Sequence, residues 1–124
     1  MKNIKLIFAL FLMLLISFTV SAQEPKTNEI DIKVSSQCNI CKESIEQAMA
    51  FEKGVVKSNV DLETHTVKVT YKSSRTSPEK IRAAIAAIGY DADDVKADEK
   101  AYNNLKDCCK KPEDREFDHS GHDH

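Results

Sequence analysis

The sequence predicts an α+β fold, a ferredoxin-like βαββαβ sandwich with a helical extension at its C-terminal end. Alternating apolar and polar residues indicate extended segments, and apolar residues spaced three and four apart indicate helices. These segments follow one another in the order strand, helix, strand, strand, helix, strand. Both helices are therefore expected to cover one face of a four-stranded antiparallel sheet, while the other face meets water.

The first strand and the first helix are predicted before residue 52. Every second residue from 30 to 34 is apolar, which predicts a strand over 29–35 with one buried face. From about residue 40 to residue 51, apolar residues recur at helical spacing among good helix formers. Gly54 follows this segment and is expected to stop the helix.

The two middle strands are predicted to form a hairpin. Residues 56–62 and 67–71 both alternate between apolar and polar types, and a turn at 63–65 separates them.

The second helix has clear start and stop signals. Ser77 is a preferred capping residue, and Pro78 and the acidic Glu79 suit the first helical turn. Gly89 ends the helix. A short last strand is expected around residues 92–95.

Composition divides the chain into four parts. We predict a signal peptide over 1–22, a folded domain over 29–97, a short helix with a cysteine pair over 98–111, and a disordered histidine-containing tail over 112–124.

The N-terminal segment has the three parts of a signal peptide. Lys2 and Lys5 give a positive start, residues 6–20 are almost all apolar, and Val20-Ser21-Ala22 resembles a cleavage site before Gln23. An uncleaved anchor is less favoured, because a membrane span needs roughly 20 apolar residues. The mature protein is expected to be exported, periplasmic or extracytoplasmic, with no stable membrane insertion after cleavage.

The charge balance argues against one class of partner. Residues 23–124 carry 16 basic and 20 acidic side chains, a net charge of −4, without a basic stripe. We therefore expect no nucleic acid partner.

The four cysteines form two tight local pairs, Cys38 with Cys41 and Cys108 with Cys109. A disulfide within either pair would close almost no loop and so constrain the unfolded chain little. Disulfides between the pairs remain open, but the spacing favours metal or redox chemistry.

Cys38 and Cys41 lie where the first strand gives way to the first helix. Free N–H groups and the positive end of the helix dipole favour the thiolate form there. Thiolates prefer soft or borderline ions such as Cu(I), Zn(II) or Hg(II). Two ligands leave an ion open to a partner's thiolate, whereas a structural zinc site has four ligands.

Residues 30–95 resemble a heavy-metal-associated domain. The resemblance rests on the segments QCNICKESIEQAM, GVVKSNVDLETHTVKVTY and SPEKIRAAIAAIGYDA. This family includes copper chaperones, domains of transport ATPases and periplasmic mercury-binding proteins, so the resemblance implies metal binding and transfer by Cys38 and Cys41. It also implies that Tyr90 lies near the bound metal, although Tyr90 could instead only close the edge of the core.

One position departs from the family. The resemblance leads us to expect a methionine two residues before the first cysteine, and Ser36 occupies that position. This methionine packs beneath the metal loop in the family, so its loss leaves both thiolates in place but bears on loop rigidity.

The resulting hypothesis is a non-enzymatic protein that binds Cu(I), or alternatively Zn(II) or Hg(II), and passes it to a membrane transporter or efflux component. Thiol–disulfide exchange is an alternative because the exported protein meets an oxidising compartment. Mercury or zinc scavenging, a docking module without metal, and two structural cysteines are the others.

Cys108 and Cys109 have two interpretations. Adjacent side chains diverge on a helix, so one ion would not easily bind both; Cys109 could pack beside Leu105 while Cys108 is incidental. Alternatively, the pair forms an accessory metal site, together with three tail histidines: His119, His122 and His124.

A helix over 98–109 could also return this pair to Cys38 and Cys41. Because the open sheet face is polar, we expect such docking to be loose.

Overall fold

The computed structural model describes residues 2–14 and 26–115. Helix α1 (Lys2–Leu14) exposes its apolar side chains, and Phe8 and Phe11 are 73% and 68% accessible. Within the described ranges, no helix has the length and apolar character that a membrane crossing requires. The predicted cleavage site at residues 20–22 lies outside the described residues.

Three antiparallel strands form the sheet, in the order β1-β3-β2. They are β1 (Thr27–Lys33), β2 (Val55–Asp61) and β3 (Thr66–Lys72). The central Val67 pairs with Ile32 on one side and Val60 on the other, so the inward-facing residues of all three strands are aligned. This register places one apolar face towards the helices.

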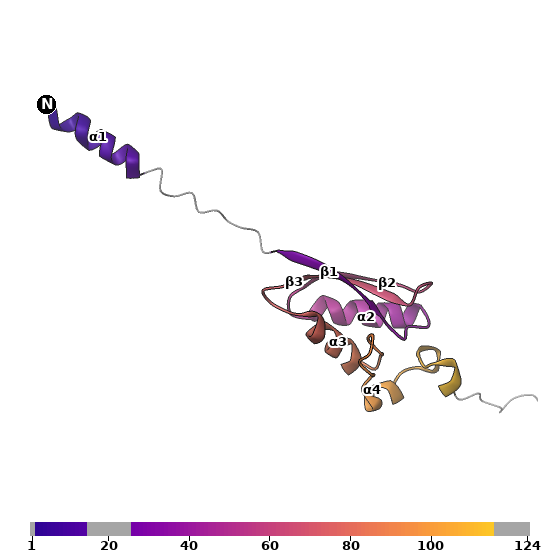
Figure 1. Ribbon diagram of the computed structural model, residues 1–124. Coiled ribbons are helices and arrows are strands. Elements are labelled where there is room, and N and C mark those ends of the chain that lie inside the picture. Colours follow the sequence, from indigo (N-terminus) through magenta and orange to yellow (C-terminus); the bar gives the residue numbers. More distant parts are fainter. Residues whose placement is uncertain (1, 15–25, 116–124) are drawn as a thin grey trace, which may run out of the picture.

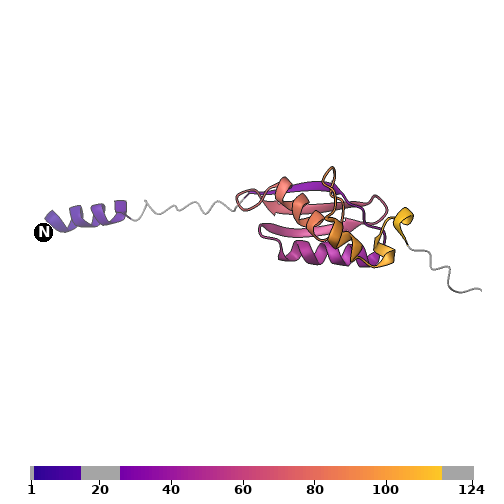
Figure 2. The same cartoon turned by 90° about the horizontal axis from the view of Figure 1, so that it is seen from below.

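Helices α2 (Asn39–Phe51) and α3 (Pro78–Ala87) both pack against that face, as Figures 1 and 2 show. The side chains that meet in the core are fully buried; among them are Ile32, Ile45, Met49, Val67, Val69, Ile81 and Ile85. Each such side chain contributes about 1.5–3 kcal/mol through burial. The cap of α3 is as predicted, because the Ser77 side chain accepts a hydrogen bond from the Lys80 N–H.

The expected fourth strand at 92–95 is reduced to two isolated bridges, Val34 with Ala92 and Ala92 with Val95. The chain turns back on itself there, since the N–H groups of Ala92 and Val95 each donate to the other's carbonyl at 2.9 Å. Asp93 has a φ of 51°, which allows this turn in place of an extended strand. The bridge to Val34 nevertheless puts the segment next to β1, where a ferredoxin-like fold has its fourth strand.

The expected single helix over 98–111 is wrong. The extension instead forms α4 (Glu99–Asn103) and two 3₁₀ turns, η2 (Asp107–Cys109) and η3 (Pro112–Asp114). Helix α4 ends at Asn103, Lys106 then adopts an extended conformation, and Leu105 and Cys109 pack against the core. Burial of these two apolar side chains outweighs the continuation of a short exposed helix.

Candidate metal centre

The loop between β1 and α2 is fixed by its neighbours. Ser35 exchanges two hydrogen bonds with Asp91: its N–H donates to the Asp91 carbonyl, and its Oγ accepts from the Asp91 N–H at 2.9 Å. The Ser36 carbonyl lies 2.7 Å from Nδ1 of His65. These contacts place the following residues, 37–41, at the start of α2.

His65 has a role that the sequence did not indicate. It lies exposed in the turn between β2 and β3, as expected, but its φ of 53° turns the chain so that its ring reaches the Ser36 carbonyl. Its own carbonyl accepts from the Val34 N–H at 2.8 Å. No sequence pattern links His65 to the loop 29 residues away, so only the folded hairpin reveals this contact.

Cys38 and Cys41 meet at the N-terminus of α2. Cys38 is the capping residue, and its carbonyl accepts the Lys42 N–H at 3.1 Å, but its side chain caps no N–H group. The two Sγ atoms lie 3.3 Å apart. Cys41 is fully buried while Cys38 is partly exposed, so an ion can reach the pair from the Cys38 side.

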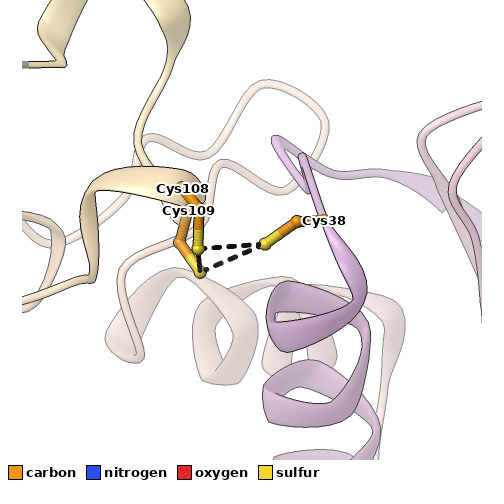
Figure 3. Close-up of side chains that lie close together, drawn as sticks. All are labelled: Cys38, Cys108 and Cys109. Atoms are coloured by element: carbon orange, nitrogen blue, oxygen red, sulfur yellow. Dashed lines mark hydrogen bonds between the residues drawn. The ribbon is translucent and has the colours of Figure 1, made fainter.

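The second cysteine pair lies against Cys38, as Figure 3 shows. Sγ of Cys38 is 3.4 Å from Sγ of Cys108 and 3.7 Å from Sγ of Cys109. The two tail sulfurs are 3.9 Å apart. The expectation that adjacent cysteines diverge is wrong here, because they lie on a 3₁₀ turn, η2, that directs both sulfurs towards Cys38.

The thiols of Cys38, Cys108 and Cys109 differ in their tendency to ionise. Burial opposes ionisation of Cys38, but hydrogen bonds from the backbone of Cys41 and from the neighbouring thiols lower the pKa of Cys38 to about 7. Burial, together with the Cys41 thiol, raises the pKa of Cys109. The hydrogen bond with Cys38 raises the pKa of Cys108. Of these three, Cys38 is the thiol most ready to receive a cation at neutral pH.

Tyr90 is 1% accessible and lies beside the cluster. Burial and the neighbouring thiols of Cys109 and Cys41 raise the pKa of the phenol, so it stays protonated. Within the described residues its hydroxyl has no hydrogen-bond partner. A buried donor without an acceptor suits a site in which thiols become thiolates, because sulfur anions accept hydrogen bonds.

The three predicted tail histidines, His119, His122 and His124, lie outside the described residues.

Ser36, which replaces the expected methionine, is fully buried, and its hydroxyl has no partner within the described part of the chain.

The sequence matches a family model, the heavy-metal-associated domain, over residues 31–91. The copper chaperone CopZ of Staphylococcus haemolyticus is 39% identical over 54 residues, which cover 44% of this chain and 79% of that protein. The chain belongs to the heavy-metal-associated domain family. The matched range contains Cys38, Cys41 and Tyr90 and ends before the tail cysteines.

Two further comparisons agree with this family. Copper-transporting ATPase 1 of Rattus norvegicus is 37% identical over 70 residues, which are 56% of this chain but only 5% of the ATPase. The crystal structure of oxidized MerP from Ralstonia metallidurans superposes with a TM-score of 0.52 at 29% identity, covering 54% of this chain and 94% of MerP. The ferredoxin-like fold of the heavy-metal-associated domain is therefore present despite the shortened fourth strand.

Proposed function

We propose that the protein is an exported, non-enzymatic carrier that binds a soft metal ion through Cys38 and Cys41 and passes it to a membrane transporter or efflux component. The observation that carries this proposal is the 3.3 Å separation of the two sulfurs at the start of α2, with the pKa of Cys38 lowered to about 7. An arriving ion meets Cys38 first and then Cys41, each thiol losing its proton as its sulfur binds.

Cu(I) is the proposed cargo, ahead of Zn(II) and Hg(II). All ligands offered by the four-cysteine cluster are sulfurs, which suit soft ions. Two of the relatives are named for copper, a chaperone and a transporting ATPase, which supports both the ion and a membrane transporter as partner.

Export is supported by the N-terminal segment. Helix α1 leaves most of its apolar side chains exposed, so it gains little from the folded domain and suits a removable signal. We expect the protein recovered from the extracytoplasmic fraction to begin at Gln23, as N-terminal sequencing would show; a chain that still begins at Met1 in the membrane fraction would contradict cleavage.

Titration of the reduced chain without oxygen tests metal binding. With Cu(I) supplied against a competing chelator, the wild type should bind, and a Cys38→Ser, Cys41→Ser double variant should lose at least 100-fold in affinity. Ser73→Ala, in an exposed loop, serves as a matched control and should bind as the wild type does. Equal affinity and stoichiometry in the double variant would reject the proposal. Parallel titrations with Zn(II) and Hg(II) rank the ions.

Thiol–disulfide exchange is the second candidate, because the Cys38 sulfur lies 3.3, 3.4 and 3.7 Å from the other three sulfurs and its thiol ionises near neutral pH. An exchange assay against a reference thiol couple separates the two functions. A redox protein would exchange rapidly and a metal carrier would not.

A further inference from the structure

We propose that Cys108 and Cys109 belong to the same metal site, so that the docked tail and Cys38 hold the ion with three or more thiolates from this one chain. The tail must then leave before the ion passes to a partner. This inference rests on the proposed function. It adds two ligands and a release step beyond the pair at the start of α2.

The spacing of the sulfurs fits a higher coordination number. With metal–sulfur bonds of about 2.3 Å, a linear site separates two sulfurs by about 4.6 Å, a trigonal site by about 4.0 Å and a tetrahedral site by about 3.8 Å. The three sulfurs of Cys38, Cys108 and Cys109 are separated by 3.4, 3.7 and 3.9 Å. Cys41 lies 3.3 Å from Cys38 but outside the group of three sulfurs that all lie within 4.8 Å of one another, so the three form the core of the proposed site.

The tail is placed by contacts that do not involve sulfur. Nζ of Lys111 pairs with the Asp91 carboxylate at 2.7 Å. The Tyr102 hydroxyl accepts the Lys111 N–H at 2.9 Å and donates to Asp114 at 2.6 Å. At the start of the extension, the Asp98 N–H donates to the Ala86 carbonyl at 2.9 Å. The cysteines are therefore brought together by the fold and not by attraction between the thiols.

The same segment also packs closely on the domain. Cys109 is 2% accessible within the core, and Leu105 packs against it. A Cβ at Gly89 would lie 2.9 Å from the backbone of Ala101 and Tyr102, so the extension touches the domain backbone directly. This packing corrects the expectation of loose docking, because the extension covers the end of α3 and not the polar sheet face.

The cluster also offers a way to stabilise several thiolates. The Tyr90 hydroxyl is buried without an acceptor beside Cys41 and Cys109, and it would gain one when either sulfur ionises. Arg115 donates to the carbonyls of Lys110 and Cys108, which places a guanidinium next to the turn that carries the tail sulfurs. A cation there offsets part of the negative charge of the sulfurs.

Release can proceed by stepwise ligand exchange. Cys108 is exposed and Cys38 partly exposed, whereas Cys41 and Cys109 are buried, so a partner's thiolate first meets Cys108. Each exchange forms one metal–sulfur bond and breaks another, and the departing thiolate takes a proton from water. The Lys111–Asp91 salt bridge is partly exposed, and such pairs contribute little to stability. Opening of the tail also takes Cys109 and Leu105 out of their packed positions, so we expect it only after the tail sulfurs have left the ion.

X-ray absorption of the Cu(I)-loaded, reduced chain tests the ligand count. We expect three or more sulfur neighbours in the wild type and two in a Cys108→Ser, Cys109→Ser variant, with at least a tenfold loss of affinity. Lys111→Ala with Tyr102→Phe, which loosens the tail and keeps every cysteine, should shift both measurements in the same direction but less. Two sulfur neighbours in the wild type, or unchanged affinity in the tail-cysteine variant, would overturn the inference.

Two controls complete the test. A wild type that binds no Cu(I) rejects the proposed function, whereas binding that ignores the tail cysteines rejects this inference alone. Native mass of the loaded protein must show one chain, because a two-chain species would assign the extra sulfurs to a second copy and overturn the intramolecular site. Hydrogen exchange of residues 106–111 should slow at least tenfold on loading in the wild type, and an unchanged rate would contradict clamping of the tail.

Discussion

At the scale of single residues, the Cys38 side chain is free to bind an ion because it does not cap helix α2. It occupies the capping position of α2, where serine or aspartate would bond a free N–H group, but its side chain makes no such bond. The N–H groups of the first turn remain available to a thiolate, and the backbone of Cys41 helps to lower the pKa of Cys38. The residue is thus suited to ligation at the expense of helix capping.

The two ligands should therefore respond differently to serine. Cys38→Ser replaces a poor cap with a good one, so the free energy of unfolding should stay equal or rise by about 1 kcal/mol while metal affinity falls. Cys41→Ser buries a hydroxyl at a fully buried site and should cost about 1–3 kcal/mol. Urea unfolding without metal measures both changes in stability. Similar losses in the two variants would contradict the conclusion that the Cys38 side chain leaves the N-terminus of α2 uncapped.

Tyr90→Phe tests the unpartnered hydroxyl. Removal of a buried donor that lacks an acceptor should raise the stability of the metal-free protein by about 1 kcal/mol. In the loaded protein the gain should vanish, because the hydroxyl then donates to a thiolate. Urea unfolding with and without Cu(I) measures the difference. A loss of stability in the metal-free variant would show that the hydroxyl already has a partner.

At the scale of elements, Gly89 connects α3 to the tail. Its φ is 102°, and a Cβ there would lie 2.9 Å from the backbone of Ala101. Gly89→Ala should therefore cost about 1–3 kcal/mol and release the extension. Gly54→Ala, at a φ of 83° and facing Thr76, is the matched control. Both variants should lose stability in urea, but only Gly89→Ala should speed protease cleavage near residues 104–106.

Ionisation of Asp93 makes the stability of the turn that replaces the fourth strand depend on pH. Burial opposes its ionisation, but Arg82 and the Lys33 N–H lower the pKa of its carboxyl. The unfolded pKa is about 3.9, so this stabilisation is complete above about pH 5 and disappears as pH falls through the lower folded value.

Asp93→Asn keeps a residue that tolerates positive φ but removes the charge. Its stability deficit relative to the wild type should be largest near neutral pH and shrink on acidification. Urea midpoints from pH 3 to pH 6 measure this trend, and a deficit that does not depend on pH would exclude the ion pair as its cause.

Local patterns predicted the elements that local forces determine. Alternation predicted β1, β2 and β3 within one or two residues of their ends, and Ser77 predicted the start of α3. The fourth strand failed because Asp93 turns the chain, which apolar spacing does not encode.

The sequence predicted only the part of the site whose residues are close together in the chain. The pairing of Cys38 with Cys41 follows from their spacing. The approach of Cys108 spans 70 residues and depends on the Asp91–Lys111 pair and on packing of Leu105, which no short window of sequence contains.

For the molecule as a whole, metal and tail should stabilise each other. An ion that binds only the folded state raises the free energy of unfolding, by about 2.7 kcal/mol when its free concentration is 100 times the Kd. The wild type should therefore gain more thermal stability from a given free concentration of Cu(I) than the tail-cysteine variant does. Calorimetric scans in a buffered Cu(I) solution compare the two, and equal gains would mean that the tail contributes no binding energy.

The short fourth strand also affects how copies of this protein meet one another. Among the described strands β1 pairs with β3 alone, and Asp93 bonds the backbone of Lys33 at the other edge. The rest of that edge carries backbone groups that a strand from another copy could bind. The charged side chains of Glu29, Asp31 and Lys33 recur along that strand, and all three are exposed. Charges on an edge strand disfavour edge-to-edge association. The open edge is thereby protected against aggregation, and the protein should remain dispersed when it is concentrated.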